Sequence, residues 1–223
     1  MNLDREFKGV VFDMDGVLIN SEPKIKLCAQ ISAKEIGYTI SNETYTSWMG
    51  LPSREIRLAI QETMGTEFPI EDFYERYRKN WNNNLEKHGM DAQPGIAELL
   101  AQLTELGIPF SVATSTDRSH ALKSLELSGL LPFIKLLVGG DQVTKGKPDP
   151  EIFIAAAELI NVPGSQCIAL EDTPIGITAA ANAGMFTIMV PDIVVPDHVF
   201  KICKYVLPST QIAARVITRL FSS

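Results

Sequence analysis

Short, largely apolar runs recur along the chain, and each run ends at a polar or turn-forming position. They are rich in β-branched and aromatic side chains and cover residues 10–12, 110–113, 168–170 and 186–190. Continuous runs of this length are typical of strands that are buried on both faces of a parallel sheet. Apolar residues with helical spacing separate them, over residues 96–106, 121–127, 152–160 and 175–183. This alternation predicts an α/β fold built on a doubly wound parallel sheet.

One long stretch, from Ser21 to His88, breaks the alternation. It is rich in polar residues, and its apolar positions repeat with helical spacing near 25–36, 54–64 and 72–85. Roughly seventy residues are far more than a connection between two elements normally takes. We therefore predict an all-helical insert with its hinges over 19–90, and a discontinuous core made of 1–18 and 91–223.

Composition narrows the class of protein. The 223 residues include 20 Lys and Arg against 27 Asp and Glu, a formal net charge of −7, so no basic face for nucleic acid is expected. No apolar run approaches the roughly 20 residues of a membrane-spanning helix, and the N-terminal apolar stretch is short for a signal peptide. The three cysteines form no Cys-x-x-Cys pair. We expect a cytoplasmic protein with no membrane contact and no obligate protein partner.

The first apolar run is followed by two carboxylates, in the segment Asp13-Met14-Asp15-Gly16. Ligands of open α/β sheets bind at the carboxyl ends of the strands. Two like charges this close are unfavourable unless they share a cation or a proton. Phosphoryl transfer can use both a cation and a proton at such a pair. Mg²⁺ binds carboxylates, one carboxylate can attack phosphorus, and the other can carry a proton. Gly16 permits a turn that a Cβ would hinder. An ordinary polar turn is the alternative.

Hydroxyl groups and a lysine follow in later turns. Thr114, Ser115 and Thr116 end the second run, where their hydroxyl and N–H groups could hold phosphate oxygens. Lys147 stands in the rigid turn Gly146-Lys147-Pro148 ahead of a helix, where its charge could neutralise Asp13 and a phosphate. Taken singly, the hydroxyl segment is better explained by a turn and helix cap, and Lys147 by a solvated surface lysine.

A second acidic pair, Glu171-Asp172, ends the third run. A metal site needs more carboxylates than Asp13 and Asp15 can give if one attacks and the other carries a proton. Asp172, with Glu171, fills that need, although a helix cap would also favour acidic residues here. Because four strand or turn ends carry matching chemistry, together they favour an active site.

Four segments, in this order, resemble the motifs of the haloacid dehalogenase superfamily: FDMDGVLINSE, VATST, KGKPDPEIF and IALEDTPIGITAAANAGM. The resemblance covers essentially the whole chain. It implies a Rossmann-like core in which Asp13 accepts the phosphoryl group and Asp15 is the general acid and base. It also implies that Thr114 binds phosphate and that Lys147 orients Asp13.

The same resemblance implies a cofactor and its ligands. Mg²⁺ would be held by Asp13, Asp172, the backbone carbonyl of Asp15, and Glu171 through water. We place Ser115 and Gly16 beside the substrate.

Within the superfamily, an aspartate at position 15 speaks for phosphate chemistry, since the dehalogenase members lack it and need no metal. The branch most similar in appearance contains β-phosphoglucomutase and sugar-phosphate phosphatases, and it carries a small helical cap where this chain has its insert. The segment MGLPSR, 49–54, resembles the cap loop of that branch, which would bring Arg54 to the substrate. A surface helix N-terminus is an equally good interpretation of Arg54.

The expected function is hydrolysis of a small phosphate monoester, a sugar phosphate or similar metabolite, through a phospho-aspartyl intermediate. A sugar-phosphate mutase is the first alternative. Two departures count against it, because the mutase has a hinge histidine where this chain has Ile25, and a Ser-Lys-Asn run where this chain reads Thr116-Asp117-Arg118. Asp117 would repel the second phosphate of a mutase substrate.

A non-enzymatic phospho-aspartate switch is the second alternative. Receiver domains also combine an acidic pair, a hydroxyl and a lysine, but their acidic pair precedes the other two. Here Glu171-Asp172 comes last, and a cap-sized insert is foreign to such domains. This order makes the switch the weakest of the three hypotheses.

Overall fold

The computed structural model describes residues 6–49, 51, 53–191 and 195–221, and of residues 53 and 54 it describes the backbone alone. The chain divides into two compact units. The core unit runs up to Asn20 and resumes at Asp91, and the cap unit covers Ser21–Met90. The core segment thus ends at residue 20, two residues later than the end at residue 18 given in the sequence analysis.

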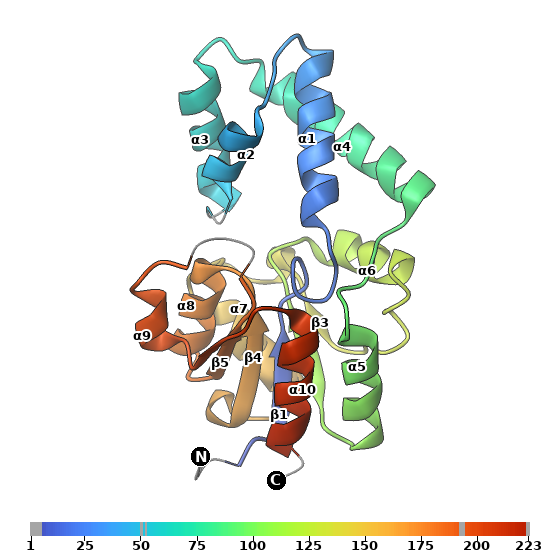
Figure 1. The fold of residues 1–223 in the computed structure, drawn as a ribbon, viewed down its shortest axis with the longest axis vertical. Coiled ribbons are helices and arrows are strands. Elements are labelled where there is room, and N and C mark those ends of the chain that lie inside the picture. The colour runs from blue at the N-terminus through green and yellow to red at the C-terminus, as the bar shows by residue number, and fades with distance from the viewer. Residues whose placement is uncertain (1–5, 50, 52, 192–194, 222–223) are drawn as a thin grey trace. The chain divides into compact units, whose positions relative to one another are not determined.

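Within the described residues, the core unit holds a parallel sheet of six strands in the order β3-β2-β1-β4-β5-β6 (Figure 1). The strands are β1 (Gly9–Phe12), β2 (Phe110–Ala113), β3 (Leu137–Val138), β4 (Cys167–Glu171), β5 (Phe186–Met189) and β6 (Tyr205–Val206). The four predicted runs are β1, β2, β4 and β5, and the strand order reverses between β1 and β4. The doubly wound α/β fold is therefore confirmed.

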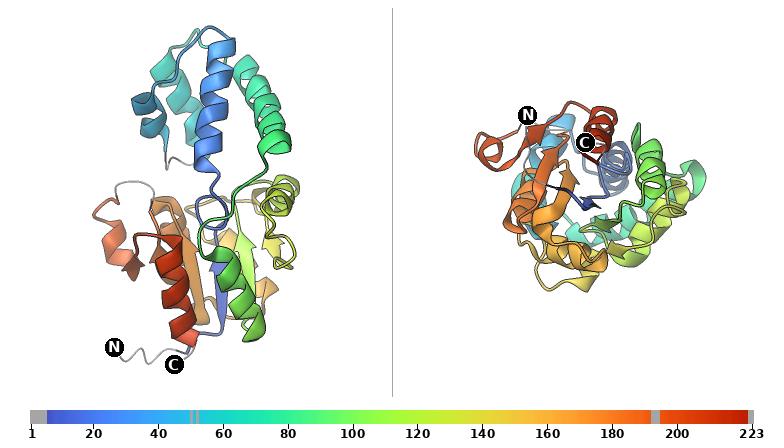
Figure 2. Two further views of the ribbon diagram at one scale, coloured as in Figure 1. Left: turned by 45° about the vertical axis from the view of Figure 1, so that its right-hand side comes forward. Right: turned by 90° about the horizontal axis from the view of Figure 1, so that it is seen from below.

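Helices cover both faces of this sheet (Figure 2). They are α5 (Ile96–Glu105), α6 (Arg118–Leu127), α7 (Glu151–Leu159), α8 (Pro174–Asn182), α9 (Val199–Ile202) and α10 (Thr210–Phe221), with single 3₁₀ turns at Gly140–Gln142 and Gly164–Gln166. Helices α7 and α8 share one apolar cluster with the sheet, and α5 packs beside α10 on the opposite face. Phe153 and Ile152 of α7 are fully buried, each contributing about 1.5–3 kcal/mol. Their burial fixes α7 and the turn ahead of it.

The cap unit consists of helices with an apolar core of their own. They are α1 (Glu22–Glu35), α2 (Asn42–Trp48), α3 (Ser53–Met64) and α4 (Ile70–His88). Helix α1 packs along α4, and α2 packs against α3. Helix α2 was not predicted; it begins after Ser41, whose hydroxyl accepts a hydrogen bond from the Thr44 N–H at 3.0 Å. The described residues of this unit contain no strand, as expected of an all-helical insert.

The register of the central strands brings two acidic segments together. Phe12 pairs with Val112 of β2 on one side and with Leu170 of β4 on the other. The N–H of Asp13 donates to the Leu170 carbonyl at 2.9 Å, so Asp13 lies level with Glu171. This is the point where the strand order reverses, which is where open α/β sheets bind ligands. Across the described ranges, no helix combines the length and apolar composition needed to cross a membrane.

Candidate active site

A buried lysine joins two buried carboxylates at the carboxyl end of the sheet. Lys147 Nζ donates a hydrogen bond to Asp13 Oδ1 and a second one, of 2.7 Å, to Glu171 Oε1. The same Nζ lies 5.0 Å from the centre of the Phe153 ring, within the range of a cation–π interaction. The helix that carries Phe153 thus also supports the ammonium group.

Burial and neighbouring charge shift the protonation of this group of residues. Burial raises the pKa of Asp13 to about 7; Lys147 opposes the rise, while Glu171 and Asp15 add to it. Burial works to lower the pKa of Lys147, but the charges of Asp13 and Glu171 outweigh it and the pKa is raised. Lys147 therefore stays an ammonium ion. One ammonium faces two carboxylates, which leaves a negative charge that a cation or a proton can balance.

A third carboxylate completes a group suited to a metal. Ligand atoms of Asp13, Glu171 and Asp172 all lie within 4.8 Å of one another. Such an all-oxygen set fits a hard divalent cation such as Mg²⁺ better than a soft metal. Gly16, with φ of +78°, leaves space for the Asp172 carboxylate, because a Cβ at position 16 would come 2.1 Å from Asp172 Oδ2. The Asp15 carboxylate is not among the three; its predicted ligand atom is the backbone carbonyl, and that stays a prediction.

The second carboxylate of the first motif is held by a hydroxyl group. Asp15 is half-buried, and its Oδ2 accepts a 2.9 Å hydrogen bond from Thr116 Oγ1. The Thr116 N–H in turn donates to Thr114 Oγ1 at 3.1 Å. Thr114 is buried and Ser115 is exposed. The hydroxyl cluster predicted from the sequence thus lies beside Asp15, but the role of Thr116 in orienting it was not foreseen.

Glu171 is fixed on its other side by the first turn of α8. The N–H and hydroxyl groups of Thr173 donate to Glu171 Oε2 at 2.6 and 2.9 Å. Thr173 Oγ1 also accepts from the Gly176 N–H at 3.1 Å, so Thr173 caps α8 as well. A Cβ at Gly176 would come 1.6 Å from Glu171 Oε1, so only glycine lets the helix start so close to the carboxylate.

Sequence reasoning also missed a residue that braces the turn after β1. Gln93 Nε2 donates to the Gly16 carbonyl at 2.9 Å, across 77 positions of the chain. No local pattern announces such a contact, because it depends on how the two segments that flank the insert return to the same place.

One predicted substrate contact, Arg54, and the position of the mutase histidine, Ile25, belong to the cap unit. Arg54 falls in α3, and its side chain lies outside the described residues, so its contact with a substrate stays a prediction. Ile25, at the position where the mutase has its histidine, packs against the apolar core of the cap unit.

Comparison with known proteins gives consistent matches. A family model described as haloacid dehalogenase-like hydrolase matches residues 10–190. A phosphorylated carbohydrates phosphatase of Thermotoga maritima is 32% identical over 178 residues, which cover 80% of this chain and 82% of the relative. A β-phosphoglucomutase of Bacillus subtilis is 30% identical over 187 residues, covering 81% and 82%. The crystal structure of a Deinococcus radiodurans hydrolase of the same family, with bound phosphate and sodium, matches with a TM-score of 0.79 at 26% identity, covering 97% and 98%.

Proposed function

This chain belongs to the haloacid dehalogenase-like hydrolase family and is a phosphoric monoester hydrolase; on that premise we propose that it hydrolyses a small phosphate monoester with Mg²⁺ as cofactor and Asp13 as nucleophile. The resemblance drawn from the four sequence motifs is confirmed. One observation carries the proposal: Lys147 is shared by Asp13 and Glu171, with Asp172 beside them. The nucleophile, its counter-charge and the metal donors thus occupy one site.

The first chemical step transfers the phosphoryl group to the protein. A carboxylate oxygen of Asp13 attacks phosphorus, and the bond between phosphorus and the ester oxygen breaks. Asp15 gives its proton to the departing alkoxide. Because Thr116 donates to Oδ2 of Asp15, the proton is carried on the other oxygen, and the carboxyl group is held in one orientation.

The second step returns the protein to its starting state. Asp15, now a carboxylate, takes a proton from a water molecule whose oxygen attacks the phosphorus of phospho-Asp13. The bond between phosphorus and the Asp13 oxygen breaks, and inorganic phosphate leaves. One water is consumed for each ester cleaved, and both carboxyl groups recover their initial protonation.

Charge balance is the main demand of both steps, since negative charge spreads over the transferring group. Lys147 favours the ionised form of Asp13 against the effect of burial and partly offsets the charge of the transferring group. Asp13 and Asp172, with the carbonyl of Asp15 and with Glu171 through water, are the proposed ligands of Mg²⁺, which when bound neutralises much of the remainder. Thr114 and Ser115 are the proposed partners of the phosphate oxygens.

The relatives support a small phosphorylated molecule, a sugar phosphate or similar metabolite, as substrate. The helical insert is the proposed cap that meets the leaving group, with Arg54 as one contact. The β-phosphoglucomutase among the relatives keeps a mutase as the second candidate. Hydrolysis is favoured because Ile25 packs in the apolar core of the cap unit and Asp117 places a carboxylate at the start of α6.

A panel of phosphorylated metabolites, assayed with Mg²⁺, tests the proposal. We expect free phosphate to be released in step with substrate loss. A coupled assay for isomerised phosphosugar serves as the counter-test. Isomerisation with little free phosphate would establish the mutase instead, and a long-lived acyl phosphate without turnover would establish the switch.

A further inference from the structure

Gln93 stands where the chain re-enters the core unit, and it contacts the turn after β1 with its main chain and its side chain. Its N–H donates to the Leu18 carbonyl at 2.9 Å, and its Nε2 donates to the Gly16 carbonyl at 2.9 Å. All of these residues belong to the core unit. The turn that carries Asp15 is therefore attached to Gln93 at both of its neighbouring carbonyls.

The side-chain contact matters because it is made to a glycine. Gly16 has φ of +78°, and a Cβ at this position would meet the Asp172 carboxylate, so a larger residue does not fit without a shift. Glycine also has the greatest conformational freedom of all residues. The Gly16 N–H donates to the Ile19 carbonyl at 2.9 Å, and the Gly16 carbonyl accepts from Gln93. With both of its polar groups engaged, the Gly16 backbone is held in one conformation.

Asp15 is thus held from two sides. Its Oδ2 accepts a hydrogen bond from Thr116 Oγ1 at 2.9 Å, and its peptide link to Gly16 is fixed through the Gly16 N–H. Because the aspartate side chain is short, a shift of the Gly16 backbone would carry the carboxylate away from Thr116. Gln93 opposes that shift through the Gly16 carbonyl, and its effect on Asp15 passes through the backbone.

Gln93 is itself firmly supported. Its carbonyl accepts from the Ile96 N–H at 3.2 Å, at the start of α5, and Ile96, Leu100 and Leu103 of that helix are fully buried. The Gln93 side chain is half-buried, where a hydrogen bond is stronger than in water. Loss of its amide should therefore leave α5 and the fold intact and release the turn alone.

We propose that Gln93 is a positioning residue for the proton transfer of Asp15. Through the Gly16 carbonyl, it keeps the Asp15 carboxyl group in the orientation from which its proton passes to the ester oxygen as the bond between that oxygen and phosphorus breaks. This inference rests on the proposed function and adds to it a residue that acts through the backbone. A misdirected Asp15 should matter most for esters whose leaving oxygen needs the proton.

Two esters separate proton transfer from the rest of the site. p-Nitrophenolate is a weak base that leaves without a proton, whereas the benzyl alkoxide is a strong base that needs one. Gln93→Met keeps the length of the side chain and removes its donor. At saturating Mg²⁺ we expect it to lower kcat/KM about tenfold for benzyl phosphate and less than about twofold for p-nitrophenyl phosphate. Equal losses for the two esters, or no loss for either, would overturn the proposal.

Other substitutions serve as controls. Gln211→Met, at an exposed position of α10 in the same unit, should change kcat/KM for neither ester. Combined with Thr116→Val, Gln93→Met should lower kcat/KM for benzyl phosphate by less than the product of the two single losses, because both act on Asp15. A full product would show that Gln93 acts on another group. If Gln93→Met fails to fold, Gln93→Asn is too short to reach the Gly16 carbonyl and should show the same difference between the esters.

A measurement without substrate distinguishes failure of this inference from failure of the proposed function. In carbon-13 NMR spectra of the full chain, the carboxyl signal of Asp15 should shift in Gln93→Met and stay in place in Gln211→Met. An unmoved Asp15 signal in Gln93→Met would overturn the inference. If the unaltered protein hydrolyses neither ester, the proposed function fails and the catalytic part of the inference with it, whereas a shifted signal would still show that Gln93 positions Asp15.

Discussion

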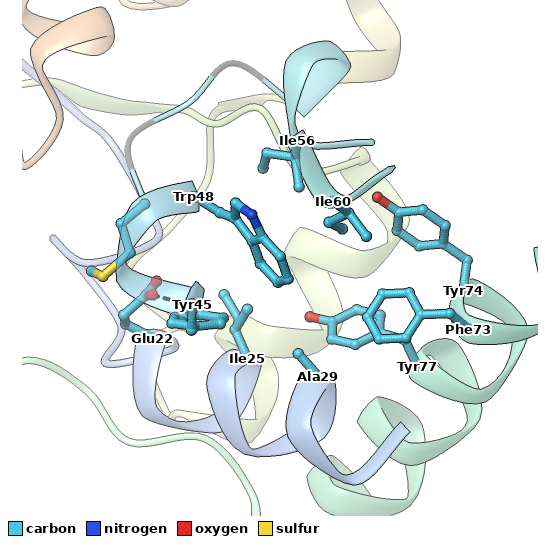
Figure 3. A pocket seen from close by; sticks show the side chains of 11 residues that line it. Glu22, Ile25, Ala29, Tyr45, Trp48, Ile56, Ile60, Phe73, Tyr74 and Tyr77 are labelled. Atoms are coloured by element: carbon cyan, nitrogen blue, oxygen red, sulfur yellow. Dashed lines mark hydrogen bonds between the residues drawn. The ribbon is translucent and has the colours of Figure 1, made fainter. Parts of the chain in front are cut away.

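The two units of this protein hold sites of opposite character. In the core unit, charged side chains are buried and tied to one another: Lys147 binds two carboxylates, and Thr116 holds a third. In the cap unit, carbon surfaces line a cavity with a single carboxylate at one end. The charged groups of the first suit the proposed transfer of a phosphoryl group, whereas the second offers largely apolar surface (Figure 3). A substitution in one of them should therefore leave the contacts of the other in place.

The largest effect should follow from Asp13→Asn, which removes the nucleophile. Hydrolysis of p-nitrophenyl phosphate should fall by about 10⁴-fold or more, because an amide does not attack phosphorus and no other carboxylate occupies its place. Phosphate release with Mg²⁺ measures the loss. Full activity would contradict the assigned nucleophile.

Lys147→Met should show that the core site is held by charge. It leaves Asp13 and Glu171 buried without their shared cation, which should lower the free energy of unfolding by about 3–5 kcal/mol in EDTA. Urea unfolding measures this difference. Mg²⁺ should stabilise the variant more than the unaltered protein, since it replaces the lost positive charge. Equal stability of the two proteins in EDTA would argue against Lys147 as the counter-charge.

The same contrast explains what the sequence could reveal. The core site follows from local signals, because acidic and hydroxyl residues stand directly after apolar runs, and parallel strands bring their carboxyl ends to one edge. The contacts of Thr116 with Asp15 and of Gln93 with Gly16 could not be predicted, because they join residues 101 and 77 positions apart, respectively. The edge strands β3 and β6 could not be predicted, because each is only two residues long and so shows no periodicity.

The cavity that residues of α1, α2, α3 and α4 line could not be predicted from the sequence at all. Its walls come from isolated residues between Glu22 and Tyr77, each of which looks like ordinary helix core in the sequence. Whether such residues close a core or leave a cavity depends on how the α1–α4 and α2–α3 pairs pack against each other. No local motif encodes that packing, so structure was needed to find the cavity.

Metal binding at the core site should weaken in acid. Burial raises the pKa of Asp13 from 3.8 to about 7 in the metal-free protein, and a metal ligand must be ionised. The dissociation constant for Mg²⁺ should therefore rise by up to about tenfold for each pH unit below 7 and stay level above it. Calorimetric titrations at pH 5.5, 6.5 and 7.5 measure this dependence. Equal affinity at all three values would contradict it.

The sign of the linked stability change provides a control. Because folded Asp13 binds a proton more tightly than unfolded Asp13, the metal-free fold should gain stability as pH falls from about 7 toward 4 and lose it as pH rises. Asp13→Asn should remove this part of the pH dependence. Unfolding in EDTA at several pH values compares the two proteins.

Thr116→Val should slow catalysis about tenfold without weakening Mg²⁺ binding. It removes the hydrogen bond that orients Asp15, while the ligands Asp13 and Asp172 keep their places. The loss should appear in kcat more than in KM, because Thr116 orients the proposed proton carrier Asp15. Thr116→Ser should restore most of the rate. A loss that Thr116→Ser does not restore, or that appears in KM alone, would reduce Thr116 to a structural role.

Tyr45→Phe should have the smallest effect on catalysis. Like Thr116→Val, it removes a hydroxyl that donates to a carboxylate, but in the cap unit. The hydrogen bond to Glu22 has a charged acceptor, so its loss should lower the free energy of unfolding by about 1.5–3 kcal/mol. The value of kcat should stay unchanged, in contrast to Thr116→Val, because Glu22 carries no proton in the proposed reaction. A lower kcat in Tyr45→Phe would show that Glu22 takes part in the chemistry.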